Sequence, residues 1–252
     1  MERRRQRRKV PNKTLLIIAS ARDEIARRLS TVWQGSGARL LHPRDLSRPG
    51  WRYQPGQIEA SSAVASGELI SARELSGVFI RLASVSAEDL IEIVPEDRPY
   101  VAQEMNAFLV AWLSALSCRV VNRPAVGCLS GPNWRPEQWI HAAAKAGVPV
   151  VPVRRRVGFD ATPVPVVPAA PTFTVTVIGN NCFGSNDPFL RRSALRIAHC
   201  ANVELLAVNF AGSGKAARFL SASLWPDLSL PDHASALLEH LTGAPRSRME
   251  LA

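Results

Sequence analysis

A segment rich in arginine and proline, residues 154–171, divides this chain into two separate patterns of strands and helices. It begins with Arg154, Arg155 and Arg156 and has prolines at positions 163, 165, 168 and 171. Prolines at this density favour extended, polyproline-like structure over a packed element. We therefore interpret 154–171 as a linker between a first domain, 13–153, and a second, 172–243. Residues 1–12 are interpreted as a disordered basic arm and 244–252 as a tail.

The first domain shows the alternation of strands and helices that is typical of a Rossmann-like parallel sheet. Residues 14–19 and 38–42 are short β-rich runs, and the helical spacing of apolar residues over 23–33 predicts a β-α-β start. Residues 77–81 are almost entirely apolar, as expected of a central strand in a parallel sheet. We also predict a strand at 68–70, a helix at 100–116, a strand at 119–121, a helix at 136–146 and an extended run at 148–152.

The second domain is predicted to be a small α+β unit, with about two helices on one face of a sheet. Its expected elements, in order, are a strand at 173–178, a helix at 188–201, strands at 203–210 and 218–226 joined by a tight turn, and a closing helix at 232–241. The fold class is therefore α/β, with a parallel sheet first and an α+β unit second.

Length and charge narrow the classes of protein. With 252 residues and 46% hydrophobic composition, the chain can build proper cores. Most of the net charge of +10 comes from residues 1–9 and Arg154 to Arg156, so the folded body is close to neutral. No apolar stretch is long enough for a membrane span, and no secretory leader follows the basic start. We expect a cytoplasmic protein without a membrane partner.

The four cysteines give no sign of a metal or redox site. Cys118, Cys128, Cys182 and Cys200 contain no CxxC pair. His199 beside Cys200 is a poor chelate, since neighbouring residues on a helix point in different directions. We expect small core residues in a reducing compartment.

Several apolar motifs, none of them specific alone, occur in an order that identifies a resemblance. They are Gly77-Val-Phe-Ile-Arg81, Gln103-Glu104, Val120-Val-Asn-Arg-Pro124, the helix and turn over 142–152, the strands over 174–179 and 202–210, and Phe219-Leu-Ser-Ala-Ser223. Over residues 14–242 this order resembles the ATP-grasp superfamily. It is most similar to amino-acid and peptide ligases of the kind that add glutamate to a ribosomal protein or modify ribosomal peptides.

The resemblance implies a nucleotide site whose polar residues this chain has changed. In that family, Mg²⁺ would be held by an acid at the position of Asn209, a Glu at that of Ser221 and an Asn at that of Ser223. A nucleotide-contacting Lys would begin the helix at Pro136, beside Arg135. Mg²⁺ prefers hard oxygen ligands, usually carboxylates. We therefore predict no metal and no cofactor, with Asn209, Ser221, Ser223 and Arg135 as remnant positions.

A subdomain that the family places in the middle of the chain is expected to be missing. Only residues 154–172 separate the run at 148–153 from the strand at 173. Nineteen residues, four of them proline, are too few for a subdomain with its own core. Half of the nucleotide clamp would then be absent.

Other polar residues have a structural and a functional reading. Lys215 follows Gly-Ser-Gly but lacks the remaining glycine and the Ser or Thr of a phosphate-binding loop, so we interpret it as part of a hairpin turn. Asn180 and Asn181 are typical turn residues. In the family this strand end lies near the cleft, so Asn180, Asn181, Arg191 and Arg192 are also candidate substrate-binding residues.

Arg81 and Glu104 form a second candidate site, at the end of a strand and on the following helix. The resemblance keeps an arginine and an acid at these places. An ion pair between the two would tie sheet to helix without any substrate. Alternatively, Arg81 holds the carboxylate of a substrate through a bidentate contact.

Tryptophans suggest a protein partner. Trp51, Trp134, Trp139 and Trp225 are candidates, and the sequence around Trp134 and Trp225 is that of loops. Exposed aromatic side chains commonly anchor protein interfaces. A partner could also cover sheet surface that a lost clamp leaves exposed.

Three functional hypotheses follow. The first is a degenerate, non-catalytic ATP-grasp protein that serves as a binding or scaffold subunit of a ligase or biosynthetic complex, or as a homodimer. The second is an ATP-dependent carboxylate–amine ligase, using ATP and Mg²⁺ through an acyl-phosphate and completed by a partner chain. The third is a nucleic-acid-binding protein that uses residues 1–9 and Arg154 to Arg156.

Overall fold

The computed structural model describes residues 13–151 and 173–243. The chain forms two compact units, Met1–Pro124 with Leu241–Ala252 and Ala125–His240. The predicted basic arm, linker and tail, and with them the arginines of the nucleic-acid hypothesis, lie outside the described residues. Each unit is described by itself.

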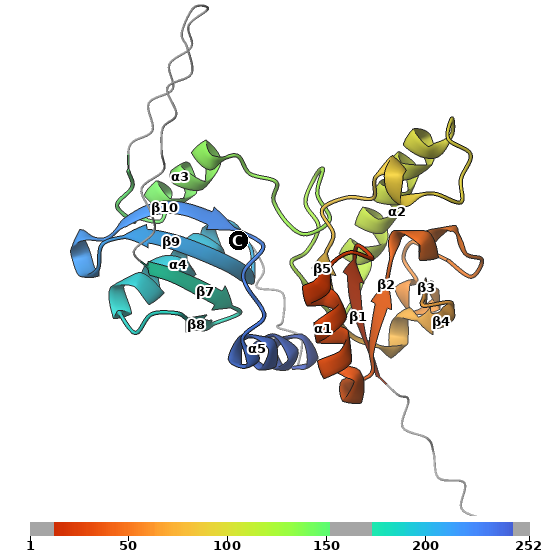
Figure 1. The fold of residues 1–252 in the computed structure, drawn as a ribbon, viewed down its shortest axis with the longest axis horizontal. Coiled ribbons are helices and arrows are strands. Elements are labelled where there is room, and N and C mark those ends of the chain that lie inside the picture. The colour runs from red at the N-terminus through yellow and green to blue at the C-terminus, as the bar shows by residue number, and fades with distance from the viewer. Residues whose placement is uncertain (1–12, 152–172, 244–252) are drawn as a thin grey trace, which may run out of the picture. The chain divides into compact units, whose positions relative to one another are not determined.

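The first unit contains a parallel sheet whose strands form because their residues are apolar on both faces (Figure 1). The strand order is β2-β1-β5-β6, so β1 and β5 are central, and both are almost completely buried. The strands are β1 (Thr14–Ala19), β2 (Ala38–Leu41), β5 (Leu75–Arg81) and β6 (Arg119–Val121), all parallel to their neighbours. This confirms the expected parallel sheet.

Two helices and a small hairpin complete this unit. They are α1 (Glu24–Val32), α2 (Arg98–Ala115) and the antiparallel pair β3 (Ser62–Ala65) and β4 (Glu68–Ser71). The end of α2 is fixed by Arg123, whose guanidinium donates to the carbonyls of Leu113, Ser114, Leu116 and Cys118 at 3.2–3.4 Å. A cation at this end of a helix is also favoured by the helix dipole.

The second unit contains an antiparallel sheet in the order β10-β9-β7-β8 (Figure 1). Its strands are β7 (Phe173–Ile178), β8 (Asn181–Phe183), β9 (Leu205–Ala211) and β10 (Arg218–Ser223). Three of these match predicted strands, and β8 extends the predicted turn after β7 into a hairpin. The closing helix is α5 (Pro231–Thr242).

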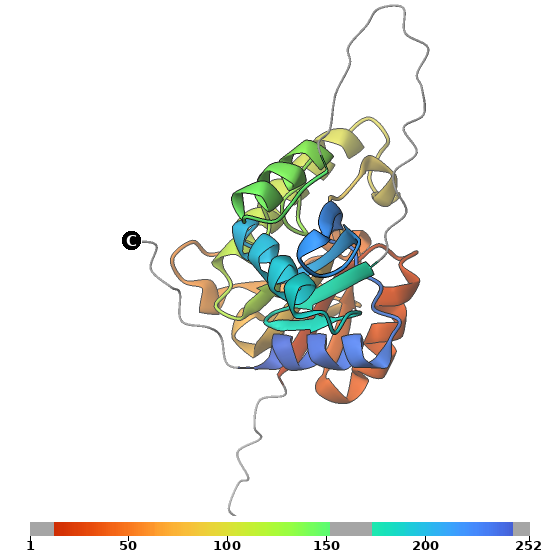
Figure 2. The same cartoon turned by 90° about the vertical axis from the view of Figure 1, so that its left-hand side faces the viewer.

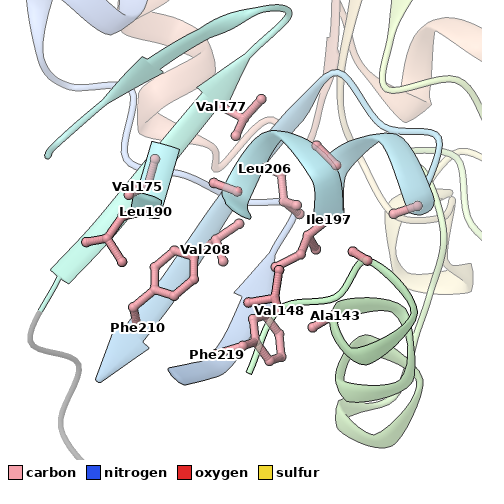
Figure 3. Close-up of a cluster of buried hydrophobic side chains, with 14 of the residues drawn as sticks. Ala143, Val148, Val175, Val177, Leu190, Ile197, Leu206, Val208, Phe210 and Phe219 are labelled. Carbon is pink, nitrogen blue, oxygen red and sulfur yellow. The ribbon is translucent and has the colours of Figure 1, made fainter. Parts of the chain in front are cut away.

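Helices α3 (Pro136–Lys145) and α4 (Pro188–Cys200) cover one face of this sheet. Their apolar sides meet the inward side chains of β7, β9 and β10 in one hydrophobic cluster, drawn in Figure 3. Val148, Leu206, Val208, Phe210 and Phe219 belong to it and are all buried. Beside β10, the backbone around Val150 pairs in parallel with Phe219, so this strand is bonded on both edges there.

The boundary between the units differs from the predicted one after residue 153. It falls after Pro124 because α3 buries its apolar side against β10 and α4. Trp139 and Ala143 of this helix are part of the cluster that holds the second unit together. The linker position therefore does not mark where one core ends and the next begins.

The remaining expectations concern cysteines and membranes. All four cysteines are free, and burial raises the pKa of the Cys118 thiol to about 11, opposed weakly by Arg123. No helix in the described ranges is long and apolar enough to cross a bilayer.

Candidate functional site

Three neutral side chains form a hydrogen-bonded ladder across the sheet of the second unit. Thr174 of β7, Asn209 of β9 and Ser221 of β10 are register neighbours on three adjacent strands. The Thr174 hydroxyl donates to Asn209 Oδ1 at 2.8 Å, and Asn209 Nδ2 donates to Ser221 Oγ at 2.9 Å. Two of the remnant metal positions, Asn209 and Ser221, are therefore brought into direct contact.

A bulge in β10 decides which side chain joins the ladder. Phe219 pairs with Phe210, but Ser221 pairs with Asn209, so Leu220 is an extra residue in this strand. Such a residue reverses the alternation of faces. Phe219 and Phe210 consequently point into the cluster beneath α3 and α4 (Figure 3), whereas Ser221 meets Asn209 on the opposite face.

This arrangement does not fit Mg²⁺. The ion needs several oxygen ligands with negative charge. Here the groups are uncharged, and Asn209 directs its amide N–H, a donor, at the oxygen of Ser221. Among residues 13–151 and 173–243, no group of three His, Cys, Asp or Glu side chains is placed to hold a metal ion. The ladder satisfies itself without a ligand.

The other two remnant positions have local roles. The hydroxyl of Ser223 accepts a hydrogen bond from the backbone N–H of Trp225 at 3.1 Å. Arg135 immediately precedes α3 and is exposed, and its backbone N–H donates to Gln138 Oε1 at 2.9 Å. Pro136 is the first residue of α3, where a missing N–H costs nothing. These residues begin a helix and close a turn.

The turn that carries Lys215 is held by a carboxylate. Lys215 is exposed in a short turn of 3₁₀ helix, Gly214–Ala216, between β9 and β10. The N–H of Gly214 donates to Asp187 Oδ2 at 2.6 Å, and Asp187 Oδ1 accepts from the N–H groups of Phe189 and Leu190 at the start of α4. The Gly214 hydrogen bond, above all, lowers the pKa of Asp187. The carboxylate thus joins a helix start to a hairpin turn.

Replacing this carboxylate should give a stability loss that depends on pH. The pKa of Asp187 is lower in the folded state, so its charge stabilises the fold above the unfolded pKa, and this is lost as pH falls through the folded pKa. Asp187→Ala should lower Tm by about 2–6 °C at pH 7. At a pH low enough to protonate this carboxylate in the folded protein, scanning calorimetry should find a smaller difference. Asp187→Asn, which keeps an acceptor, should lose less; equal Tm losses at both pH values would contradict this account.

The predicted substrate-binding residues of the second unit lie on two surfaces. Asn180 is exposed in the two-residue turn between β7 and β8, and Asn181 is exposed at the start of β8. Arg191 and Arg192 are exposed on α4. The turn has a structural reason: Gly179 has a φ of +59°, and its N–H donates to the Glu204 carbonyl at 2.7 Å. The turn conformation is thus explained by Gly179, and a substrate-binding role of Asn180 and Asn181 stays a prediction.

The structural interpretation of Arg81 and Glu104 expected an ion pair between them. In the structure, Arg81 instead pairs with Asp23. Its Nε donates to Asp23 Oδ2 at 2.8 Å, and the two side chains are only 10% and 13% exposed. The other oxygen of Asp23 accepts from the N–H of Ala26 and begins α1. Glu104 is exposed on α2. The charge that neutralises Arg81 thus comes from the loop after β1, which lies beside β5 in the sheet.

The tryptophans divide into packed and exposed residues. Trp139 is buried, and Trp134 packs on it with ring centres 4.9 Å apart, so Trp134 is not the free anchor that its loop sequence suggested. Trp51 packs edge to face on Trp112, 5.6 Å away. Trp225 is 42% exposed. It is the candidate that fits an interface best.

Sequence reasoning missed Thr174, Asp187 and Asp23. The alternation of polar and apolar residues along 173–178 could have placed Thr174 on the polar face of its strand. Asp23 and Asp187 each stand directly before a helix, the usual signal of a helix-capping residue. Their second partners, Arg81 and Gly214, are far away in sequence and left no local signal.

Comparisons with known proteins find likeness in structure only. No protein-family model matches the sequence, and no curated protein matches it significantly. Macrocyclase MdnC bound with precursor peptide MdnA, from Microcystis aeruginosa MRC, is 12% identical with a TM-score of 0.65, over 92% of this chain and 100% of that one. The ATP-grasp ligase PsnB complexed with minimal precursor is 11% identical with a TM-score of 0.62, over 90% and 98%. A RimK domain protein, ATP-grasp, from Sphaerobacter thermophilus DSM 20745 is 16% identical with a TM-score of 0.51, over 91% and 100%. At these identities the likeness establishes the fold alone.

Proposed function

We propose that this chain, whose fold is that of the ATP-grasp ligases, is a non-catalytic binding or scaffold subunit of a ligase or biosynthetic complex. The fold confirms the resemblance found in the motifs. The proposal concerns what the fold does here: it binds a protein or peptide partner and does not turn over ATP. The precursor peptides in the MdnC and PsnB structures support a peptide or protein as the kind of partner.

The ladder of Thr174, Asn209 and Ser221 is the observation that carries this proposal. A nucleotide-bound Mg²⁺ would find only neutral oxygens here, and it would compete with the two hydrogen bonds that Asn209 already forms. Losing satisfied hydrogen bonds without a better partner is unfavourable. A functioning Mg²⁺ site would instead present carboxylate oxygens that the surrounding residues hold in position.

Two further departures support the same conclusion. Pro136 and Arg135 begin α3, where the resemblance implies a nucleotide-contacting Lys. Only nineteen residues, 154–172, are available for the subdomain that would complete a nucleotide clamp. We propose that this subdomain is missing.

Calorimetric titration of the full chain with ATP, in Mg²⁺ and in EDTA, tests the proposal. We expect no saturable heat up to a Kd of about 1 mM. A matched variant, Asn209→Asp with Ser221→Glu and Ser223→Asn, supplies the oxygen set that the resemblance implies. Binding by the variant and not by the natural chain would trace the loss to these three positions. Micromolar, metal-dependent binding by the natural chain would disprove the proposal.

The ligands bound in one structurally similar protein, PsnB, support a second candidate function, that of an ATP-dependent ligase. PsnB was solved with minimal precursor, Mg and ADP. By analogy, this chain could be an ATP-dependent carboxylate–amine ligase that a partner chain completes. ATP turnover would then be found only in the presence of the partner, and Asn209→Leu with Ser221→Leu would abolish it. Turnover that survives this double substitution would place the nucleotide site in the partner.

A further inference from the structure

The outward side of helices α3 and α4 forms a basic surface on the second unit. The two helices pack against each other over one face of the sheet, and Figure 2 shows them next to each other in green and light blue. Their inward sides are committed to the hydrophobic cluster. Their outward sides are exposed, and we define the α3–α4 face as the exposed residues His141, Lys145, Arg191, Arg192, Arg196 and His199.

The spacing along α4 places its basic residues on one side. Arg192, Arg196 and His199 follow one another at four and three residues, the repeat that keeps side chains on one face of a helix. Arg191 flanks this row. The thirteen residues of α4 contain no acid, and α3 contains one, Glu137 in its first turn. The face therefore has a clear excess of positive charge.

This charge is not neutralised by the described part of the chain. The ion pairs of Arg27, Arg39, Arg48 and Arg81 all lie in the first unit. The arginines of α4 form none within residues 13–151 and 173–243. Neighbouring guanidinium groups repel one another, and a negatively charged partner would relieve that repulsion.

Arg196 also has a structural role, so Arg191 and Arg192 are the arginines best suited to bind a partner. A Cβ on Gly147 would come within 2.7 Å of the Arg196 guanidinium, so this side chain lies across the turn that ends α3. A cation there is favoured by the helix dipole. No such contact explains Arg191 or Arg192, whose side chains are exposed.

Apolar side chains next to these charges favour a protein partner over a single-stranded nucleic acid. Leu195 of α4 and Ile140 of α3 are only partly buried against the cluster, so part of each is accessible. Leu195 follows Arg191 by four residues, so it lies on the same side of α4 as that arginine. Proteins that bind single-stranded nucleic acids usually add exposed aromatic rings for base stacking. The large exposed apolar residues of the described chain include Tyr100 and Trp225, but neither is on α3 or α4. Arginine beside small apolar patches is typical of protein interfaces.

We propose that the α3–α4 face docks an acidic amphipathic segment of a partner protein. Its carboxylates would meet Arg191 and Arg192, with support from Lys145, while its apolar side chains would contact Leu195 and Ile140. Charge complementarity selects the partner and speeds the encounter. The inference deepens the proposed function by naming the surface and the chemistry of the partner. It rests on that function only in requiring a protein partner.

The test is an NMR titration of the ¹⁵N-labelled full chain with a synthetic peptide. The probe is a Leu/Glu amphipathic helix of about 18 residues, or five turns. A second peptide has Gln in place of every Glu, and a DNA duplex is the third probe. We expect the acidic peptide to shift amides of α3 and α4 at a salt concentration of about 0.05 M and to be released at about 0.5 M. The Gln peptide should not bind.

Matched charge reversals complete the test. Arg191→Glu with Arg192→Glu should raise the Kd of the acidic peptide about tenfold. Arg22→Glu with Arg28→Glu, exposed residues of the first unit, changes the net charge equally and should have no effect. The proposal is overturned by equal losses in both variants, by shifts elsewhere, by tighter binding of the DNA to these amides, or by self-association that the first pair abolishes. ATP binding is measured in the separate calorimetric titration. The proposed function and the proposed docking surface can therefore be disproved independently.

Discussion

Phe219→Ala is expected to lower the free energy of unfolding of the second unit by about 4 kcal/mol. Phe219 is 1% exposed, lies in β10 between Phe210 and the backbone around Val150, and faces α3 in the cluster (Figure 3). Truncation would remove its transfer free energy and leave a cavity that rigid neighbours fill only in part. Guanidinium unfolding followed by circular dichroism would measure the loss.

Ser221→Ala is the matched control, two residues further along the same strand. Ser221 is exposed and contributes one hydrogen bond, to Asn209. We expect a loss of about 0.5–1 kcal/mol. Comparing the two losses tests whether the apolar side chains of β10, rather than its polar ones, hold this strand in the sheet. If the two substitutions cost the same, the cluster would not be what fixes β10 in the sheet.

Asp23→Ala should lower the stability of the first unit by about 3 kcal/mol. One oxygen of Asp23 begins α1, and the other binds Arg81 at 2.8 Å in a place where both side chains are nearly buried. The substitution removes a helix cap and takes the carboxylate away from a guanidinium that has little contact with water. Hydrogen exchange by mass spectrometry would locate the loss in β1, β5 and α1.

A double-mutant cycle separates the two roles of Asp23. Asp23→Asn keeps an acceptor for the N–H of Ala26, so it should retain most of the cap and lose the ion pair. Arg81→Met removes the guanidinium. Because the pair is coupled, Asp23→Ala in the Arg81→Met background should cost less than in the natural chain, by about 1–2 kcal/mol. Strictly additive losses would show that Arg81 is stabilised by its other neighbours.

The elements that sequence alone predicted are those with strong local patterns. β1 and β5 are continuous apolar runs, and α2 has long helical spacing, so all three were expected within two residues of their ends. β3 was missed because Ser62–Ala65 consists of small residues and becomes a strand only by pairing with β4. The boundary between the two compact units differs from the predicted linker for a similar reason: the partners of α3 lie in β10 and α4, later in the chain.

Asn209 and Ser221 remain a prediction as a remnant site, and the structure adds the hydrogen bonds that they form. Family resemblance placed Asn209 and Ser221 at equivalent points, and they are register partners. The hydrogen bonds of the Asn209 amide with Thr174 and Ser221 could not be predicted from strand patterns. The register that allows them depends on the bulge at Leu220. Likewise, Glu104 was paired with Arg81 because the family resemblance keeps an acid on that helix. The carboxylate that contacts Arg81 belongs to Asp23, 58 residues away in sequence.

The ladder of Thr174, Asn209 and Ser221 also bears on how this protein persists in a cell. An enzyme that binds Mg·ATP in its folded state is stabilised in proportion to the logarithm of nucleotide concentration over Kd. Under the proposed function, this sheet receives no such contribution, and its polar face is already satisfied by its own side chains. The abundance of the protein would then be insensitive to the energy state of the cell and would follow the supply of its partner instead.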